Sequence, residues 1–430
     1  MENSANSPFR QKRWRQAWDL SQSFGRIEDK EWGTKRGGRR MATWGLEWLE
    51  GVADVWRQPL LYYGLLLAWG AGWRRVKRER RDFHVRVYRL GQEWRGLWTW
   101  GWVAGAVLSV IASGIGLALP PDAVWAVTGL TILLGLTMEA RLLSPAYTVG
   151  GALVLLGLAG PSGLAAHLLS DGAADGGALA ALLVLLLLAE GWLILRSRNG
   201  AASPQLARSK RGMIVGMQWT QRFWFVPVVL PISDGALPSV SWWPLIPAGD
   251  GYSFWLVPFL LGFSQRRQHV LPAEAAREEG RRVLRLAWLV AVLAVFGLWH
   301  PLLGAAAGAA AIIGREWIAF SGHRADRARP PRFARHPQGV VIVGVLPNSK
   351  AEQMGLSIGE VIVKANGVPV QTEAEFYEAL QRNRAFCKLE VISHNGEIRF
   401  VQGAVYEDGH HELGLLFVHQ RGSSASEAVS

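Results

Sequence analysis

The sequence predicts a polytopic α-helical membrane protein that ends in a small soluble α+β domain. Hydrophobic residues make up 50% of the 430-residue chain, charged residues only 19%, and the mean hydropathy is +0.13. Up to Phe320 the apolar residues form long blocks, each close to the roughly 20 residues that a helix needs to cross a bilayer. From Gly339 onward, short alternating apolar stretches are separated by Pro, Asn and Gly, which is typical of strands and turns.

The N-terminal segment is polar and basic over residues 1–40 and lacks the apolar core of a signal peptide. We interpret it as a disordered basic arm or as an extension upstream of the physiological start, which we place at Met41. Residues 41–57 carry apolar side chains at an approximate helical spacing. They predict an interfacial amphipathic helix or, alternatively, an extension of the first span.

The membrane domain is expected over residues 58–320, with roughly seven to nine spans. The candidate spans are 59–73, 97–119, 123–138, 146–169, 178–195, 283–299 and 301–320. Residues 213–263 are ambiguous, because their many prolines break spanning helices and their tryptophans favour the headgroup layer. This stretch predicts two short spans or a re-entrant hairpin packed against the other helices.

Lysine and arginine residues gather in alternate loops and predict the orientation, since cytoplasmic loops carry an excess of them. The loop 74–89 is the most basic, so we place it in the cytoplasm. A basic linker, 321–338, then leads to a cytoplasmic domain over residues 339–418 and a disordered tail over 419–430. Cys387 is the one cysteine, so no intrachain disulfide can form, and its labelling from outside intact cells would contradict this orientation.

The net charge of +12 comes from basic residues beside apolar blocks, which favours a membrane role over nucleic-acid binding. Contacts with anionic membrane lipids are one interpretation of the first basic loop; the other is that its cations only fix the topology. The candidate lipid contacts are Arg74, Arg75, Lys77, Arg78, Arg80 and Arg81.

The C-terminal domain shows the most specific pattern. A strand from Val340 precedes turns and a second strand, and the pair Asn366-Gly367 predicts a tight hairpin. Thr372 is expected to cap a helix that carries Phe376 and Leu380 on one face. The final apolar segment is Leu413, Gly414, Leu415, Leu416 and Phe417.

This order resembles a bacterial PDZ domain whose carboxylate-binding loop comes last, which implies a circular permutation. The resemblance implies a peptide groove between that final segment and the helix bearing Phe376 and Leu380. The alternative is that 413–418 is only a closing core strand. For the groove, Gly414→Trp is expected to abolish partner recruitment and leave folding intact, whereas Phe376→Ala would also remove core packing.

Catalytic chemistry finds little support. The string His410-His411-Glu412 has the wrong spacing for a zinc site, and Ser162 has no assignable His–Asp pair. Glu190 lies within a predicted span, but the sequence offers no buried partner for it, which disfavours transport. We therefore predict no catalytic residue, no metal and no cofactor. A membrane protease with a PDZ domain, or its regulatory subunit, is the alternative.

A wider resemblance covers most of the chain from Met41 onward, and residues 1–40 have no counterpart in it. The string PLLYY in the first span, the basic string RVKRERRDFHVRV, several further spans and a C-terminal PDZ-like domain together resemble the MinJ family of cell-division topological determinants. The family implies a scaffold that links a DivIVA-like polar protein to a MinD-like ATPase, with other divisome proteins as further candidate partners. It also implies a plasma-membrane location enriched at division septa and poles.

Overall fold

The computed structural model describes residues 54–98, 100–159, 175–197, 202–209, 212–239, 243–246, 251–297, 301–383, 386–404 and 413–418. The expected arm 1–40, the tail 419–430 and all but the end of the expected helix 41–57 lie outside these ranges. The final residues of that helix form a short 3-10 turn, η1 (Asp54–Arg57).

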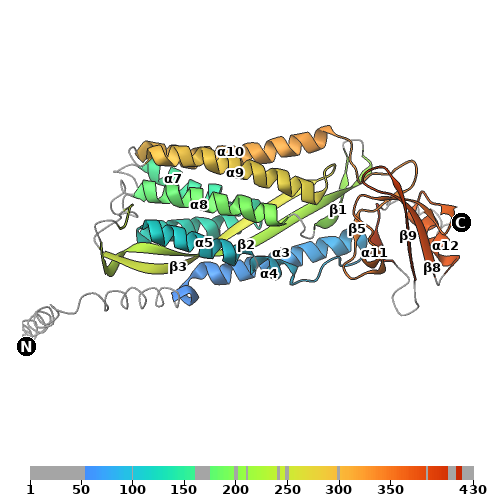
Figure 1. Cartoon of the computed structure of the whole chain (residues 1–430), viewed down its shortest axis with the longest axis horizontal. Coiled ribbons are helices and arrows are strands. Elements are labelled where there is room, and N and C mark those ends of the chain that lie inside the picture. Colours follow the sequence, from blue (N-terminus) through green and yellow to red (C-terminus); the bar gives the residue numbers. More distant parts are fainter. Residues whose placement is uncertain are drawn as a thin grey trace, which may run out of the picture.

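A long helical body carries the small C-terminal domain at one end (Figure 1). The helices run side by side along the long axis. They are α3 (Pro59–Phe83), α4 (Gln92–Leu97), α5 (Trp100–Ile115), α6 (Pro121–Gly135), α7 (Pro145–Ala159), α8 (Asp175–Arg196), α9 (Pro272–Gly297) and α10 (Pro301–Ala328), with a 3-10 turn, η2 (Ala140–Leu143), before α7. Among the described residues, two segments are long and apolar enough to cross a bilayer, Gly176–Arg196 and Leu302–Ala328, and three shorter helices are also apolar.

Most described residues of the ambiguous stretch 213–263 form an antiparallel β-ribbon, which agrees with the alternative of a hairpin packed against the other helices and not with that of two short helical spans. Strands β2 (Ile214–Pro238) and β3 (Gly251–Arg267) pair along most of their length, and β1 (Ser203–Arg208) pairs with the start of β2. The ribbon packs among the helices. Even-numbered side chains of β2, such as Val226 and Val228, join the core of helices α5 to α10, while Phe223 and Phe225 pack against α3.

The outer edge of β2 faces α5 and would leave backbone groups unpaired in apolar surroundings. The N–H of Val229 donates to Ser109 Oγ at 2.8 Å, and Ser113 Oγ donates to the carbonyl of Val229 at 3.1 Å. The carbonyl of Pro231 accepts from the N–H of Leu119 at 3.0 Å. The backbone N–H and C=O groups of odd-numbered residues in this part of β2 therefore point away from β3. Pro227 and Pro231 occupy such outward positions, where a proline has no N–H to satisfy.

Glycines allow α5 to approach this edge closely. A Cβ added at Gly101 would overlap the carbonyl oxygen of Phe225, and one added at Gly105 would overlap that of Pro227. Only a glycine face lets the helix backbone lie directly against the ribbon. Prolines that break a helix thus form a buried strand edge here, because a glycine- and serine-bearing helix covers it.

The C-terminal domain has its own core around a small sheet. The sheet order is β4 (Val340–Val341), β6 (Val361–Ala365), β8 (Phe386–Ile392) and β9 (Ile398–Ala404), with β7 (Val368–Pro369) beside β6, and β10 (Leu415–Leu416) pairs separately with β5 (Gly344–Val345). Two short helices, α11 (Lys350–Gln353) and α12 (Glu373–Gln381), pack beside it. The predicted Asn366-Gly367 turn is confirmed: both residues have positive φ between β6 and β7.

The expected basic linker 321–338 is largely ordered structure. Helix α10 continues to Ala328, and Asp326 accepts the N–H groups of Gln268 and His269 at 2.8 and 3.0 Å. Phe333 is fully buried, and its carbonyl accepts from the N–H of Gly216 at 2.7 Å. Tertiary contacts thus hold this linker against the ribbon.

An apolar interface joins the C-terminal domain to the helical body. It contains Phe83 and Val87 from the body, Phe333 from the connection, and Val343 and Leu416 from the domain. In addition, the amide of Gln218 on β2 donates to the carbonyl of Val343 at 2.6 Å. The domain is therefore mounted on the body rather than tethered to it.

We predict that Gly105→Leu sharply lowers the thermal unfolding temperature of the purified protein in detergent, because a side chain there forces α5 away from Pro227. Gly114→Leu on the same helix is the matched control, since a Cβ at Gly114 meets nothing within 4 Å. The control should be neutral or slightly stabilising, because leucine favours a helix over glycine by roughly 1 kcal/mol. Equal unfolding temperatures for the two variants would contradict the close contact between α5 and the edge of β2.

Candidate peptide-binding groove and charged clusters

Helix α12, one wall of the candidate groove, begins at a reciprocal cap. Thr372 Oγ1 accepts the N–H of Glu375 at 3.3 Å, which confirms the predicted cap, and the Glu375 carboxylate accepts the N–H of Gln371 at 2.8 Å. Hydrogen bonds to the carboxylate, first from the Gln371 N–H and then from the Thr372 side chain, lower the pKa of Glu375. The cap therefore contributes stability above the ordinary glutamate pKa and loses it as pH falls through the lowered value.

Three aromatic rings join α12 to the final segment. Phe376 and Phe417 are both fully buried and lie edge to face with their ring centroids 5.2 Å apart, and Tyr377 lies 6.5 Å from Phe417. Leu380 and Tyr377 are only partly buried against the same core. Phe376 is thus a core residue, and Tyr377 and Leu380 are the side chains of α12 that border the groove.

Strand β10 presents one backbone edge to β5 and the other away from it. The carbonyls of Gly414 and Leu416 accept N–H groups of Leu346 and Val343, both at 2.8 Å. Backbone groups of successive strand residues alternate in direction, so those of Leu415 and Phe417 point to the opposite edge. Within the described ranges no strand pairs with that edge, which makes it the candidate edge for an added peptide strand.

The side chains of the final segment divide between two cores. Leu413, Leu415 and Phe417 belong to the core of the C-terminal domain, whereas Leu416 belongs to its interface with the helical body. Burial of these side chains in a core agrees with the alternative that 413–418 is a closing core strand, and the peptide groove stays a prediction.

Gly414 is a poorer probe of the groove than the sequence suggests. Its φ is +81°, and an added Cβ would overlap Ser349 Cβ and lie 2.9 Å from Ser349 Oγ. A tryptophan there would strain the backbone and displace the start of α11, so the expectation that Gly414→Trp leaves folding intact is wrong.

The expected role of Cys387 as a labelling site also fails. Its side chain is fully buried, and burial raises the pKa of the thiol to about 12. The thiolate that a maleimide attacks is therefore scarce at neutral pH.

The arginine-rich segment is mainly helix, because α3 continues to Phe83. Arg74, Lys77, Arg80 and Arg81 are exposed there. Arg75 is not free for a lipid headgroup: it is buried and pairs with Glu79 at 2.9 Å and Glu93 at 2.6 Å.

Arg78 is engaged as well. Its guanidinium lies 3.6 Å from the ring centroid of Trp219, and burial, aided by the nearby charge of Arg266, lowers its pKa to about 10. Of the six candidate lipid contacts, Arg75 therefore joins α3 to the following loop and α4, and Arg78 packs α3 against the ribbon.

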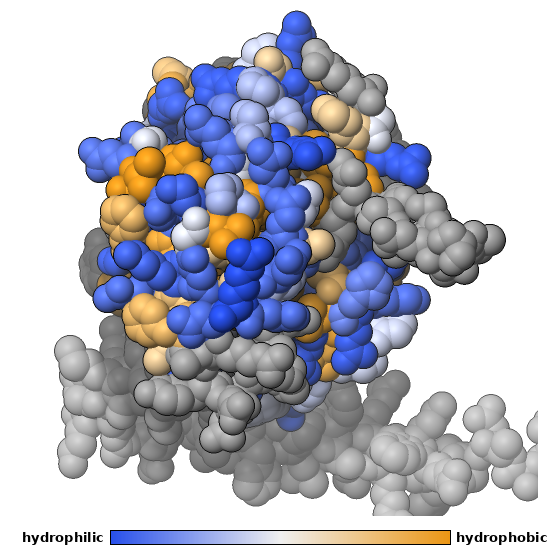
Figure 2. Space-filling view, turned by 90° about the vertical axis from the view of Figure 1, so that its right-hand side faces the viewer, coloured by the Kyte–Doolittle hydropathy of each residue, from blue (hydrophilic) through white to orange (hydrophobic). Residues whose placement is uncertain are grey.

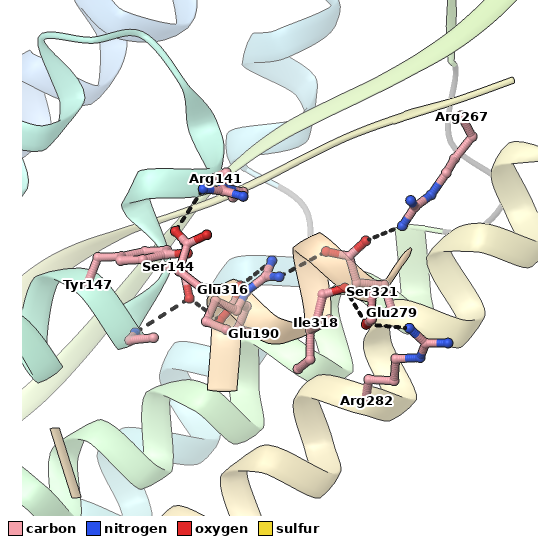
Figure 3. A network of polar contacts seen from close by, with 12 residues as sticks. Arg141, Ser144, Tyr147, Glu190, Arg267, Glu279, Arg282, Glu316, Ile318 and Ser321 are labelled. Carbon is pink, nitrogen blue, oxygen red and sulfur yellow. Dashed lines mark hydrogen bonds and ion pairs between the residues drawn. The ribbon is translucent and has the colours of Figure 1, made fainter. Parts of the chain in front are cut away.

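A buried charge network crosses the helical body (Figure 3). Arg315 on α10 lies between Glu190 on α8, at 3.3 Å, and Glu279 on α9, at 2.9 Å, and all three are buried. Ser144 Oγ donates to Glu190 at 2.6 Å, and Arg267 on β3 pairs with Glu279 at 3.3 Å. Glu190 therefore has a buried partner, contrary to the sequence interpretation.

The network is balanced in charge, with two carboxylates against two guanidiniums. A balanced buried set fixes the relative positions of the elements that supply it, because each member would otherwise be an uncompensated charge. Sequence reasoning missed Arg315, because it stands beside Glu316 and Trp317 and so has the appearance of an interfacial cation. Its neighbour Glu316 is exposed and pairs with Arg141 at 2.8 Å, as expected of an interfacial residue.

Comparisons with known proteins agree with this geometry. A profile of the PDZ domain matches residues 341–392. The chain is 37% identical over 382 residues to the cell division topological determinant MinJ of Bacillus subtilis (strain 168), which covers 87% of this chain and 96% of that protein. It is 28% identical over 355 residues to the probable cell division topological determinant MinJ of Lacticaseibacillus paracasei, covering 80% and 90%.

A further match, to the serine protease HTRA3 of Mus musculus, is 34% identical but spans only 74 residues, or 17% of this chain. Fold and site together define a PDZ-domain protein whose binding module is mounted on an apolar helical body. The chain belongs to the MinJ family of cell division topological determinants. It is accordingly an adaptor rather than an enzyme.

We predict that Arg315→Met destabilises the protein by about 3–5 kcal/mol, because it leaves Glu190 buried without a cation. Adding Glu190→Gln should recover part of this loss, since Glu279 keeps its pairing with Arg267. Thermal unfolding in detergent measures both effects. Arg141→Met, which breaks the exposed pair with Glu316, is the matched control and should cost only about 0–1 kcal/mol. A network without structural importance would give the two methionine variants the same unfolding temperature.

Proposed function

We propose that this protein is a multi-pass scaffold of the plasma membrane that acts in division-site selection. In this proposal its cytoplasmic PDZ domain and loops link a DivIVA-type polar protein to a MinD-type division inhibitor, at division septa and poles. The observation that carries the proposal is a peptide-type strand edge fixed at the polar end of an otherwise apolar helical body. A scaffold needs these two properties, membrane retention and an accessible docking edge, and needs no catalytic group.

The outward faces of the helices support membrane insertion. Large apolar side chains are exposed along the body, where a water-soluble protein would carry polar ones. They are Leu66, Trp69, Val103, Val107, Val110, Leu133, Leu155, Trp288, Leu289, Val292, Val295, Phe296, Leu302, Ile313, Trp317 and Phe320. The end that carries the PDZ domain shows mostly hydrophilic residues, with smaller hydrophobic patches between them (Figure 2).

The border between these surfaces supports the orientation. On α3, exposed Trp73 is followed by exposed Arg74; on α9, exposed Arg285 precedes exposed Trp288; on α10, exposed Trp317 precedes exposed Arg324. Tryptophan at the headgroup level and cations just beyond it are typical of the cytoplasmic side of a membrane protein. All three borders lie toward the end that holds the PDZ domain.

The β-ribbon is compatible with insertion because it is enclosed. Strands are tolerated at membrane depth only where protein covers their edges and faces. Here α5 covers the β2 edge, and α3 and the α5–α10 core cover the two faces. We therefore include the ribbon among the membrane-crossing elements.

We predict that an introduced cysteine at exposed Gln381, in the PDZ domain, reacts with a membrane-impermeant maleimide only after permeabilisation. A cysteine at exposed Asp122, at the other end of the body, should react in intact cells. Native Cys387 is the internal control and should stay unlabelled until the protein is denatured. Labelling of Gln381→Cys from outside would reverse the proposed orientation.

We also predict that Leu380→Glu, which places a carboxylate in the groove, removes recruitment of at least one of the two partners. Fluorescent fusions of the scaffold and of the MinD-type protein report this as loss of polar and septal foci, and cell length reports the division defect. Ala374→Glu adds the same group at an exposed position of α12 and should leave the foci unchanged. If a Leu380→Glu protein present at normal levels in the membrane keeps both partners, the groove is not the docking surface.

A further inference from the structure

A second cleft, separate from the PDZ groove, lies between the PDZ domain and the helical body. Its volume is about 1130 Å³. Three segments contribute most of the lining: the loop after α3 with residues from 86–92, the start of α9 with residues 271–273, and the segment from β5 to α11 with residues from 345–352. Ala202 and Ile358 complete it. The cleft thus touches the β5 side of the β10–β5 pair, whereas the free edge of β10 lies on the other side.

Two buried side chains of α3, Glu79 and Arg75, hold the backbone of the wall that the body contributes. The buried carboxylate of Glu79 accepts the N–H groups of Val87 at 2.9 Å and Tyr88 at 3.4 Å. Arg75 donates to the carbonyls of Tyr88 at 3.4 Å and Arg89 at 2.9 Å. We call these contacts of Glu79 and Arg75 the Glu79 clasp. They use backbone groups of the loop, so the exposed side chains of Arg86 and Arg89 remain available at the cleft.

The wall contributed by the PDZ domain is equally ordered. Ser349 accepts the N–H of Glu352 at 3.3 Å, and the Glu352 carboxylate accepts the N–H of Asn348, so a capping box fixes the start of α11. That carboxylate keeps its charge, so the cleft lining carries two cations, Arg86 and Arg89, against this one anion. Between the walls the lining is mixed: the apolar residues Val87, Leu271, Pro272, Leu346 and Ile358 lie beside the polar residues Tyr88, Gln92 and Asn348.

We propose that this cleft binds an extended acidic peptide segment with interspersed apolar residues, supplied by a partner protein. The two exposed arginines match carboxylates of the ligand, and the apolar residues of the lining match its apolar side chains. Because both walls are ordered before binding, the ordering cost of binding is limited. A lipid headgroup fits less well, because one wall belongs to the PDZ domain. The cations best placed for lipid, Arg74, Lys77, Arg80 and Arg81, lie on α3 outside the cleft.

Fluorescence anisotropy of the full-length protein in detergent tests this. The probe is a labelled peptide of about ten alternating glutamate and leucine residues. A peptide of the same length with lysine in place of glutamate is the control of opposite charge. The Arg86→Gln, Arg89→Gln double variant should bind the acidic probe roughly tenfold more weakly or worse, since each lost contact is a charge-assisted hydrogen bond. The Arg80→Gln, Arg81→Gln double variant removes the same charge outside the cleft and should bind like the wild type.

Three results would overturn the inference. Equal weakening by the two double variants would mean a diffuse charge effect. Loss of the acidic probe in Leu380→Glu, but not in the Arg86, Arg89 variant, would place the peptide in the PDZ groove. Unchanged peptide binding by the cleft variant, with reduced sedimentation on phosphatidylglycerol vesicles, would make the cleft a lipid site. Both arginines are exposed, so unchanged thermal unfolding should accompany the expected loss of binding.

Discussion

The fold of the helical body depends on satisfying the backbone of a β-strand in apolar surroundings. One edge of β2 is paired by β3, but the other is paired by β1 only at its start and must otherwise find its partners in α5 and in Leu119 after it. The solution combines three residue types: serines that hydrogen-bond Val229, prolines that remove N–H groups at outward positions, and glycines that let the helix come close. Without that seam the ribbon would carry uncompensated polar groups through the core, and the helices packed on its two faces would lose their common support.

Electrostatics supply a second constraint at the end nearest the PDZ domain. The Arg315 network connects α8, α9, α10 and the ribbon, and the Glu79 clasp connects α3, the following loop and β1, where Ser203 Oγ donates to Glu79 at 2.8 Å. Both centres are buried, so each contributes specificity by penalising any arrangement that separates its charges. Together they bring elements distant in sequence to one surface, which then receives the PDZ domain.

The sequence predicted the parts that follow from local chemistry. The PDZ-like order, the Asn366-Gly367 turn and the Thr372 cap each follow from the conformations that a few neighbouring residues favour. The β-ribbon could not be predicted this way, because proline argues against a central strand unless the covering helix is known in advance. The same holds for Arg75 and Arg315: a charge near an apolar block is typical of an interface, and only tertiary structure supplies the buried acids that pair with them.

The mounting of the PDZ domain determines what kind of scaffold the protein makes. A domain on a flexible tether sweeps a volume, and its effective concentration for a second ligand falls with tether length. A domain held by Phe333, Leu416 and Gln218 against the body has no such freedom. In the proposed membrane scaffold, its height above the bilayer and the direction of its strand edge are then fixed by the chain, so partners would be selected by position as well as by sequence.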